Sequence, residues 1–335
     1  MTRKNTNWTY SPFLLAPAGK DYLWGGTRLR DDFRKKLPME PLAETWECST
    51  HPDGLSVAAS GVHAGRTLKE VLEMHPEYLG THPDYQDGLP ILIKFIDARE
   101  DLSVQVHPDD DYAAQHENGS LGKTEMWYIV DTEKDARIAY GFCHDMKREV
   151  LEKSLRDGSV EKYLQRVKVE KDDVFFISSG TVHALGAGTL VAEIQECSNI
   201  TYRLYDYGRM GKDGKQRPLH IDQALETANL SGSDRPRQPM RVLKYRKGIA
   251  MELLCRCSYF QVERMLVNTE HCREMAQYQT QENSFQVFLC LKGCGSLFME
   301  NSQYLNFFKG DCIFLPARSV PVKIHGNAQL LVVGC

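Results

Sequence analysis

Short apolar stretches bounded by turn residues dominate this chain, and they limit the folds open to it. Several carry β-branched or aromatic residues, and Leu102–His107 alternates polar and apolar side chains, a period that is typical of strands. The ten candidate strands are Pro90–Ile96, Leu102–His107, Met126–Val130, Asp173–Ile177, Leu190–Ile194, Thr201–Tyr205, Phe285–Leu289, Ser296–Met299, Cys312–Leu315 and Leu330–Val333. So many short strands predict a mainly β protein, an antiparallel sandwich or jelly roll.

Few helices are expected. Leu68–Met74 follows Thr67, and Glu70 stands where the second half of a capping box belongs. The charged, periodic segment 145–162 predicts one or two more helices.

The length of 335 residues suggests two domains, because single hydrophobic cores rarely grow past roughly 250–300 residues. The polar stretch Ser231–Pro239 is the best linker candidate. We therefore expect a first domain over residues 1–235 and a second over 240–335.

An internal resemblance crosses that boundary. Lys171–His183 and Lys309–Pro321 both contain an acidic turn, an apolar strand and then a tight turn, with Pro321 at the position of His183. The pattern favours two related jelly-roll barrels, of which only the first keeps metal ligands, although short strand-and-turn patterns also recur by chance.

Composition excludes several classes of protein. The formal net charge of −4 argues against bulk nucleic-acid binding. The longest apolar runs are far shorter than the roughly 20 residues of a membrane span, and residues 1–20 lack the apolar core of a secretory signal. We expect a cytoplasmic protein whose ten cysteines are reduced thiols acting as small hydrophobes, because no paired CxxC motif is present.

Polar side chains that bind metals recur on the predicted strands. In an extended Ser103–His107 segment, Ser103, Gln105 and His107 face the same way. A polar face among apolar neighbours is costly to bury without a partner, and a metal ion or a wet cavity removes that cost.

Two further candidates complete the set: Glu125, which shares a strand face with Lys123, and His183, which follows a glycine turn. Two imidazoles, a carboxylate and an amide oxygen suit Zn²⁺, with Mn²⁺, Co²⁺ or Fe²⁺ as substitutes.

At these residues the chain resembles the type I phosphomannose isomerases, in particular their short bacterial form. The matching stretches are Leu102–Asp109, Gly122–Tyr128, Gly180–Leu185 and Thr201–Tyr207, with Pro17, Trp24–Gly26 and Glu44–Glu47 near the start. Several motifs in the right order make the resemblance specific over residues 10–210, and it extends more loosely to the end.

The resemblance implies a zinc-dependent cupin with one Zn²⁺ per chain, bound by Gln105, His107, Glu125 and His183. It makes Arg203 the family's essential arginine, and it places Glu193 and Lys123 near the reacting atoms. Lys94 and Ser103 match positions that line the substrate pocket.

The expected activity is interconversion of mannose 6-phosphate and fructose 6-phosphate through an enediol or enediolate. Arg203 suits the enediolate oxygens because it is permanently charged and donates two parallel hydrogen bonds. The proton-transferring base is either Lys123 or Glu193, and structural roles for all three residues stay open. The alternatives are a non-catalytic sugar-phosphate sensor and a metal cupin acting on another sugar. The partners expected are a small sugar phosphate, no nucleic acid and no membrane, in a monomer or a homodimer.

Overall fold

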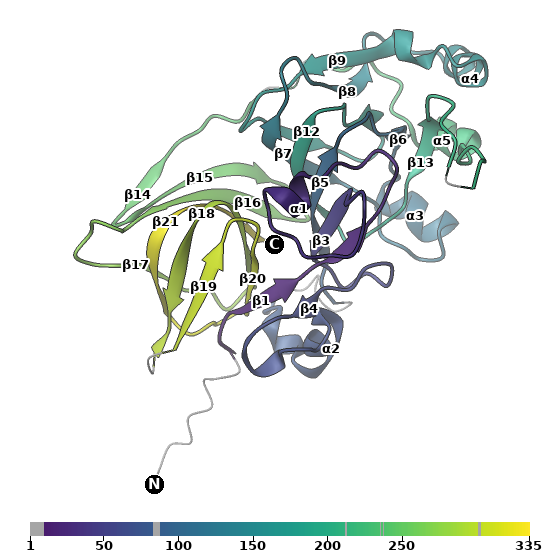
Figure 1. The fold of residues 1–335 in the computed structure, drawn as a ribbon. Coiled ribbons are helices and arrows are strands. Elements are labelled where there is room, and N and C mark those ends of the chain that lie inside the picture. Colours follow the sequence, from purple (N-terminus) through teal and green to yellow (C-terminus); the bar gives the residue numbers. More distant parts are fainter. Residues whose placement is uncertain (1–9, 83–87, 212, 235, 237, 301–302) are drawn as a thin grey trace.

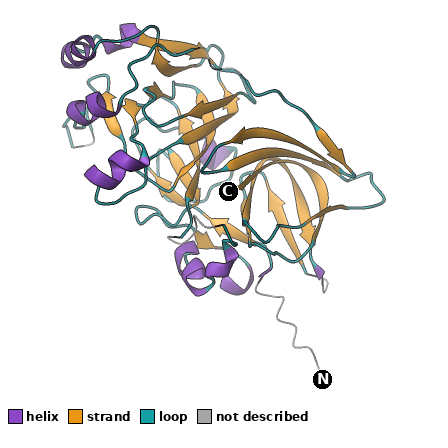
Figure 2. Ribbon diagram, turned by 180° about the vertical axis from the view of Figure 1, so that it is seen from behind, coloured by secondary structure: helices purple, strands orange, loops and turns teal. Residues whose placement is uncertain are grey.

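The computed structural model describes residues 10–82, 88–211, 213–234, 236, 238–300 and 303–335. The predicted linker falls partly outside these residues, because positions 235 and 237 are among those left out. Strands form most of the regular structure, so the prediction of a mainly β protein with few helices is confirmed (Figures 1 and 2). In the described parts, no helix is both long and apolar enough to span a bilayer.

The largest sheet combines strands from both ends of the chain. Its order is β14 (Lys244–Arg246), β15 (Ile249–Arg256), β16 (Gln261–Asn268), β21 (Val322–Gly334), β18 (Gln286–Phe298), β20 (Cys312–Leu315), β1 (Phe13–Ala16) and β4 (Val57–Ala58). Two more strands pair alongside this path, β17 (Ala276–Tyr278) with β21 and β19 (Tyr304–Phe308) with β18.

Two further sheets hold the remaining strands. The second has the order β10 (Val174–Ile177), β7 (Glu125–Thr132), β12 (Thr189–Glu196), β5 (Ile91–Ala98), β3 (Glu44–Cys48) and β2 (Ala18–Lys20). The third has the order β13 (Tyr202–Tyr205), β6 (Val104–Val106), β11 (His183–Ala184), β8 (Arg137–Phe142) and β9 (Leu164–Lys168).

Helices cover the outside of these sheets. They are α1 (Arg28–Asp31), α2 (Leu68–Met74), α3 (Asp110–His116), α4 (Arg148–Asp157) and α5 (Ile221–Thr227). The predicted capping box of α2 is present, because Thr67 Oγ1 accepts from the Glu70 amide and the Glu70 carboxylate accepts from the Thr67 amide. Helix α2 lies beside β1 and β4, whereas α3 and α5 lie on the lobe that contains β6 and β13 (Figure 1).

One prediction is wrong in detail. Phe285–Leu289 and Ser296–Met299 are not separate strands but parts of the single strand β18. Within β18, a Cβ atom at Gly293 would come within 2.0 Å of the Asn327 carbonyl oxygen. Only a glycine therefore lets the neighbouring backbone approach this closely.

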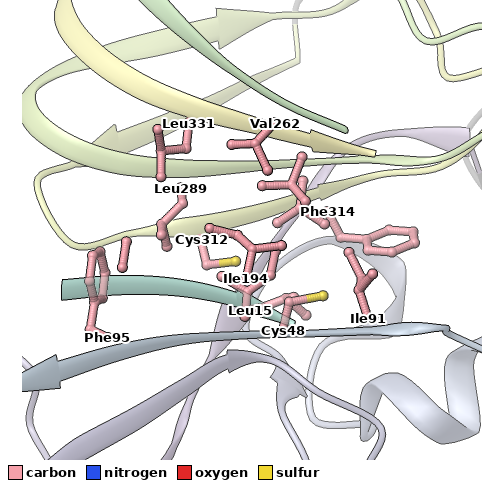
Figure 3. Close-up of a cluster of buried hydrophobic side chains, with 14 of the residues drawn as sticks. Leu15, Cys48, Ile91, Phe95, Ile194, Val262, Leu289, Cys312, Phe314 and Leu331 are labelled. Carbon is pink, nitrogen blue, oxygen red and sulfur yellow. The ribbon is translucent and has the colours of Figure 1, made fainter. Parts of the chain in front are cut away.

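The main hydrophobic core joins the first two sheets. Cys48, Ile91 and Ile194 on one side meet Val262 and Phe314 on the other, all of them buried (Figure 3). Burying each large apolar side chain stabilises the fold by roughly 1.5–3 kcal/mol. Two of the cysteines, Cys48 and Cys312, lie in this core as free thiols.

Candidate metal centre

Three buried side chains converge where β6, β7 and β11 begin or end. His107 directly follows β6, Glu125 opens β7 and His183 opens β11, and one ligand atom from each lies within 4.8 Å of the others. The pairing of β6 with β11 sets His183 opposite Gln105. Nε2 of His183 is 3.2 Å from Oε1 of Glu125, and Nε2 of His107 is 3.5 Å from Oε2.

The hydrogen bonds of these residues leave donor atoms free for a metal ion. His183 Nδ1 lies 2.8 Å from the Thr181 carbonyl oxygen and donates to it, so Nε2 keeps its lone pair and points at Glu125. Both carboxylate oxygens of Glu125 and Nδ1 of His107 are buried without a hydrogen-bond partner among the described residues, and the Lys123 ammonium forms an ion pair with one of those oxygens at 3.2 Å. Such atoms are costly to bury, and a bound cation would satisfy the carboxylate.

The charge state of the cluster also suits a cation. Burial by itself raises the pKa of Glu125, but Lys123 and the two histidines outweigh it and hold the pKa well below the usual value. Burial, reinforced by Lys123, keeps the pKa of His107 well below its usual value, so this imidazole is neutral. An ionised carboxylate and a neutral imidazole are the forms that bind metals.

Gln105 lies at the edge of this cluster. Its amide nitrogen is 3.3 Å from His183 Nε2, and turning the amide over would bring its carbonyl oxygen to that position. The structure therefore brings together all four of the predicted ligands, three of them fully buried and Gln105 half-buried.

A cavity of about 260 Å³ adjoins the cluster. The predicted site residues that line it are Lys94, Ser103, Gln105, Lys123, Glu193 and Arg203. Lys123 connects it with the cluster, since its Nζ lies 3.1 Å from His107 Nε2 and 3.2 Å from Glu125 Oε2. Every sequence-predicted site residue therefore lies in the cluster or in the wall of this cavity.

The cavity pairs a buried lysine with a buried carboxylate. Lys94 Nζ lies 3.3 Å from Glu193 Oε1, and the indole N–H of Trp127 donates to Glu193 Oε2 at 2.8 Å. Burial, with the nearby charge of Glu125, raises the pKa of Glu193. Burial lowers the pKa of Lys94, but Glu193 and Glu44 outweigh it and the net shift is upward.

Arg203 lies in the wall of the same cavity, where one side-chain oxygen and one backbone oxygen accept hydrogen bonds from its guanidinium. Its Nε donates to Ser103 Oγ at 3.3 Å, and one terminal nitrogen donates to the Pro218 carbonyl oxygen at 3.1 Å. Four further lining residues lie outside the motifs singled out from the sequence: Tyr22, Ile96, Asn199 and Arg217. Arg217 binds Asp206, which falls within the motif Thr201–Tyr207, so that carboxylate was the one available signal for it.

Contacts from distant parts of the chain fix the backbone around Lys123. The Gly122 amide donates to Asp110 Oδ1 at 2.8 Å, and the Thr124 amide donates to Glu196 Oε1 at 2.6 Å. Asp110 Oδ2 in turn accepts from the Tyr259 hydroxyl at 2.9 Å, although 149 positions separate these residues.

The sequence matches two family models. Residues 13–157 match the catalytic domain of phosphomannose isomerase type I, and residues 251–334 match the cupin domain of mannose-6-phosphate isomerase. The putative mannose-6-phosphate isomerase YvyI of Bacillus subtilis is 39% identical over 324 residues, which cover 97% of this chain and 99% of the relative. The chain belongs to the type I phosphomannose isomerases.

Other members of the family agree. Mannose-6-phosphate isomerase ManA of Bacillus subtilis is 38% identical and matches over 97% of this chain and 99% of its own length. The crystal structure of the mannose 6-phosphate isomerase from Bacillus subtilis superimposes with a TM-score of 0.87 at 36% identity, covering 96% of this chain and 99% of that one. A structure described as mannose 6-phosphate isomerase bound with zinc and yttrium shares the fold, with a TM-score of 0.73 at 16% identity over 96% of this chain and 99% of that one.

Proposed function

We propose that this chain is a metal-dependent aldose–ketose isomerase that interconverts mannose 6-phosphate and fructose 6-phosphate through an enediol or enediolate. The observation that carries the proposal is the buried His107, Glu125 and His183 cluster beside a cavity rich in cations, in a chain of this family. A sensor would need neither a metal nor a base. We also propose that the enzyme works in the cytoplasm, where sugar phosphates are metabolised.

The metal proposed is Zn²⁺, one per chain, bound by the two histidines and the carboxylate, with Gln105 as the fourth and weakest ligand. Two imidazole nitrogens and carboxylate oxygen are donors that Zn²⁺ prefers. When bound, the ion supplies positive charge beside the sugar oxygens, where negative charge develops.

The side chains that line the cavity have the remaining roles in the proposed reaction. Glu193 is the proposed base for proton transfer between C1 and C2, because a buried carboxylate with a raised pKa is a better match to neutral pH than an ordinary one. Lys94 stabilises its ionised form from 3.3 Å. Lys123 and Ser103 bind substrate oxygens, and Arg203 stabilises the enediolate.

A coupled isomerase assay with mannose 6-phosphate tests the proposal. The protein as purified is expected to turn the sugar over, to stop after complete removal of metal by a chelator, and to recover with added Zn²⁺. Activity that survives full metal removal would overturn the metal-dependent mechanism. A metal-loaded protein that binds the sugar phosphate without turnover would instead indicate a sensor.

The rate is expected to fall at high pH because of Glu196. Burial raises the pKa of this carboxyl to about 8, and the nearby Asp110 adds to the effect. Below that pH the protonated carboxyl can donate to Asp110 while it accepts from the Thr124 amide. Above it, two carboxylates face each other, with Tyr259 and Cys257 as the other titratable groups alongside, and the Lys123 segment loosens.

We expect kcat to fall by up to roughly tenfold between pH 7 and 9, less than the roughly 100-fold cost of a 1 Å misplacement. Glu196→Gln mimics the protonated acid, so it should keep the activity at pH 7 and lose this decline. Full pH–rate profiles of both proteins measure the difference. An unchanged decline in the variant would show that another group causes it.

A further inference from the structure

The C-terminal sheet repeats the strand order of the sheet that holds Glu125. The order β2-β3-β5-β12-β7-β10 matches β14-β15-β16-β21-β18-β20 strand for strand. Both sheets also bulge at the same places, with Glu47 matching Leu254 and Val130 matching Leu291 as the extra residues. Coincident bulges fix the correspondence residue by residue, because a one-residue slip would separate them.

The turns on either side of β10 and β20 repeat as well. Asp172 and Gly310 both have left-handed backbone, with φ of 71° and 96°, and so do Gly180 and Arg318, with φ of 81° and 55°. The Gly180 amide donates to the His107 carbonyl oxygen at 2.8 Å, and the Arg318 amide donates to the Gln281 carbonyl oxygen at 3.0 Å. Gln281 is therefore the counterpart of His107.

The other counterparts follow from strand register. Ile177 pairs with Glu125 as Leu315 pairs with Gln286, so Gln286 stands for Glu125. Gln105 precedes His107 by two positions, so Gln279, two positions before Gln281, is its counterpart. The sequence repeat makes Pro321 the counterpart of His183. On β16, Glu263 stands for Lys94, since Val332 pairs with Glu263 as Glu193 pairs with Lys94.

These counterparts line a second cavity. It measures about 820 Å³ against about 260 Å³ for the first, and Gln279, Gln281, Gln286, Glu263 and Pro321 all belong to its wall. Amides carry no charge and proline offers no side-chain donor, so this set does not suit a metal ion. The repeat has therefore kept a polar hollow while replacing the groups of the metal centre.

The lining suits an anionic ligand with many hydroxyl groups. Each glutamine amide both donates and accepts hydrogen bonds, as sugar hydroxyls do, and the Tyr278 hydroxyl binds the amide oxygen of Gln286. Among the described residues of the wall, Lys244, Arg246 and Arg256 stand against one side-chain carboxylate, that of Glu263. Three cations to one carboxylate give the described wall a net positive charge, which favours a ligand that carries a phosphate.

We propose that this C-terminal cavity is a second, metal-free binding site for a sugar phosphate. Its amides bind the hydroxyls, and the cations of its wall, among them Arg246 beside one end of β15 and Arg256 at the other, supply the positive charge that attracts the phosphate. The assignment rests on the lining of the cavity and uses the proposed function only to choose the probe.

The test counts binding sites on the zinc-loaded full chain by calorimetric titration with mannitol 1-phosphate, which has no carbonyl group and cannot be isomerised. We expect two sites per chain in the wild type. The double variant Arg246→Ala, Arg256→Ala should weaken the second site by at least ~10-fold, as loss of charge-assisted hydrogen bonds implies. Both arginines are exposed, so the variant should fold, and Arg156→Ala is a matched exposed control.

Two further probes separate phosphate recognition from hydroxyl recognition. Free mannitol should not occupy the second site measurably, and inorganic phosphate should compete only weakly. One site per chain in the wild type, or two sites that both survive the double variant, would overturn the proposal. Isomerase activity, measured on the same samples, should be unchanged in the double variant, and a wild type without activity would count against the proposed function alone.

Discussion

Glu125→Ala should lose both its metal and its activity. Glu125 contributes the only carboxylate in the buried cluster, and its two oxygens face the two histidines. Without it, two neutral imidazoles and an amide must hold a divalent cation. We expect metal content to fall from one ion per chain to near zero, and kcat to fall by more than the roughly 100-fold that loss of an outer partner of a metal ligand costs. Elemental analysis and the isomerase assay measure the two effects.

The repeat supplies a matched control for this experiment. Gln286 holds the position of Glu125 in the C-terminal sheet, so Gln286→Ala removes a side chain in the same backbone setting. That variant should keep its metal and its rate. Full activity in Glu125→Ala with metal retained would remove Glu125 from the centre, and loss of metal in Gln286→Ala would mean that both substitutions act through folding.

Arg203→Ala should keep its metal and lose most of its rate. The guanidinium lies at the cavity and contacts none of the proposed ligands by a hydrogen bond, so the metal centre should remain intact. Removing a donor that stabilises developing negative charge costs roughly 100- to 1000-fold in kcat. Steady-state kinetics on samples of confirmed metal content measure the loss.

A lysine at this position separates charge from geometry. Arg203→Lys keeps the positive charge but cannot make two parallel hydrogen bonds, so it should recover only part of the rate. Arg156→Ala, on the exposed face of α4, is the control and should behave as the wild type. A normal kcat with a raised KM in Arg203→Ala would make this residue a substrate-binding group instead.

Local patterns in the sequence predicted much of the fold. Period-two alternation found the strands near Gln105 and His107, and a Thr67–Glu70 spacing found the start of α2. Both depend on neighbours a few residues apart. The same local reasoning divided β18 into two strands. At Gly293, between the two predicted strands, the backbone that approaches comes from β21, more than thirty residues later in the chain.

For the candidate site too, the sequence predicted the residues, and the structure was needed to show their contacts. Local motifs named all the predicted site residues, but no motif indicated that Lys94 faces Glu193 or that Tyr259 reaches Asp110. Those contacts depend on which strands pair and in which register. A backbone hydrogen bond decided that Gln281 corresponds to His107, and strand register decided that Gln286 corresponds to Glu125, since of these positions only His183 and Pro321 were aligned by the sequence repeat.

The sequence by itself determined a mainly β chain of this family with a candidate set of ligands, because strand periodicity and motif spacing are local properties. The tertiary structure decided which side chains meet, which carboxylates are buried, and that the C-terminal sheet keeps a cavity where the corresponding sheet has the candidate metal cluster. Those features depend on the pairing of strands far apart in the chain, and on the burial that only a complete core provides.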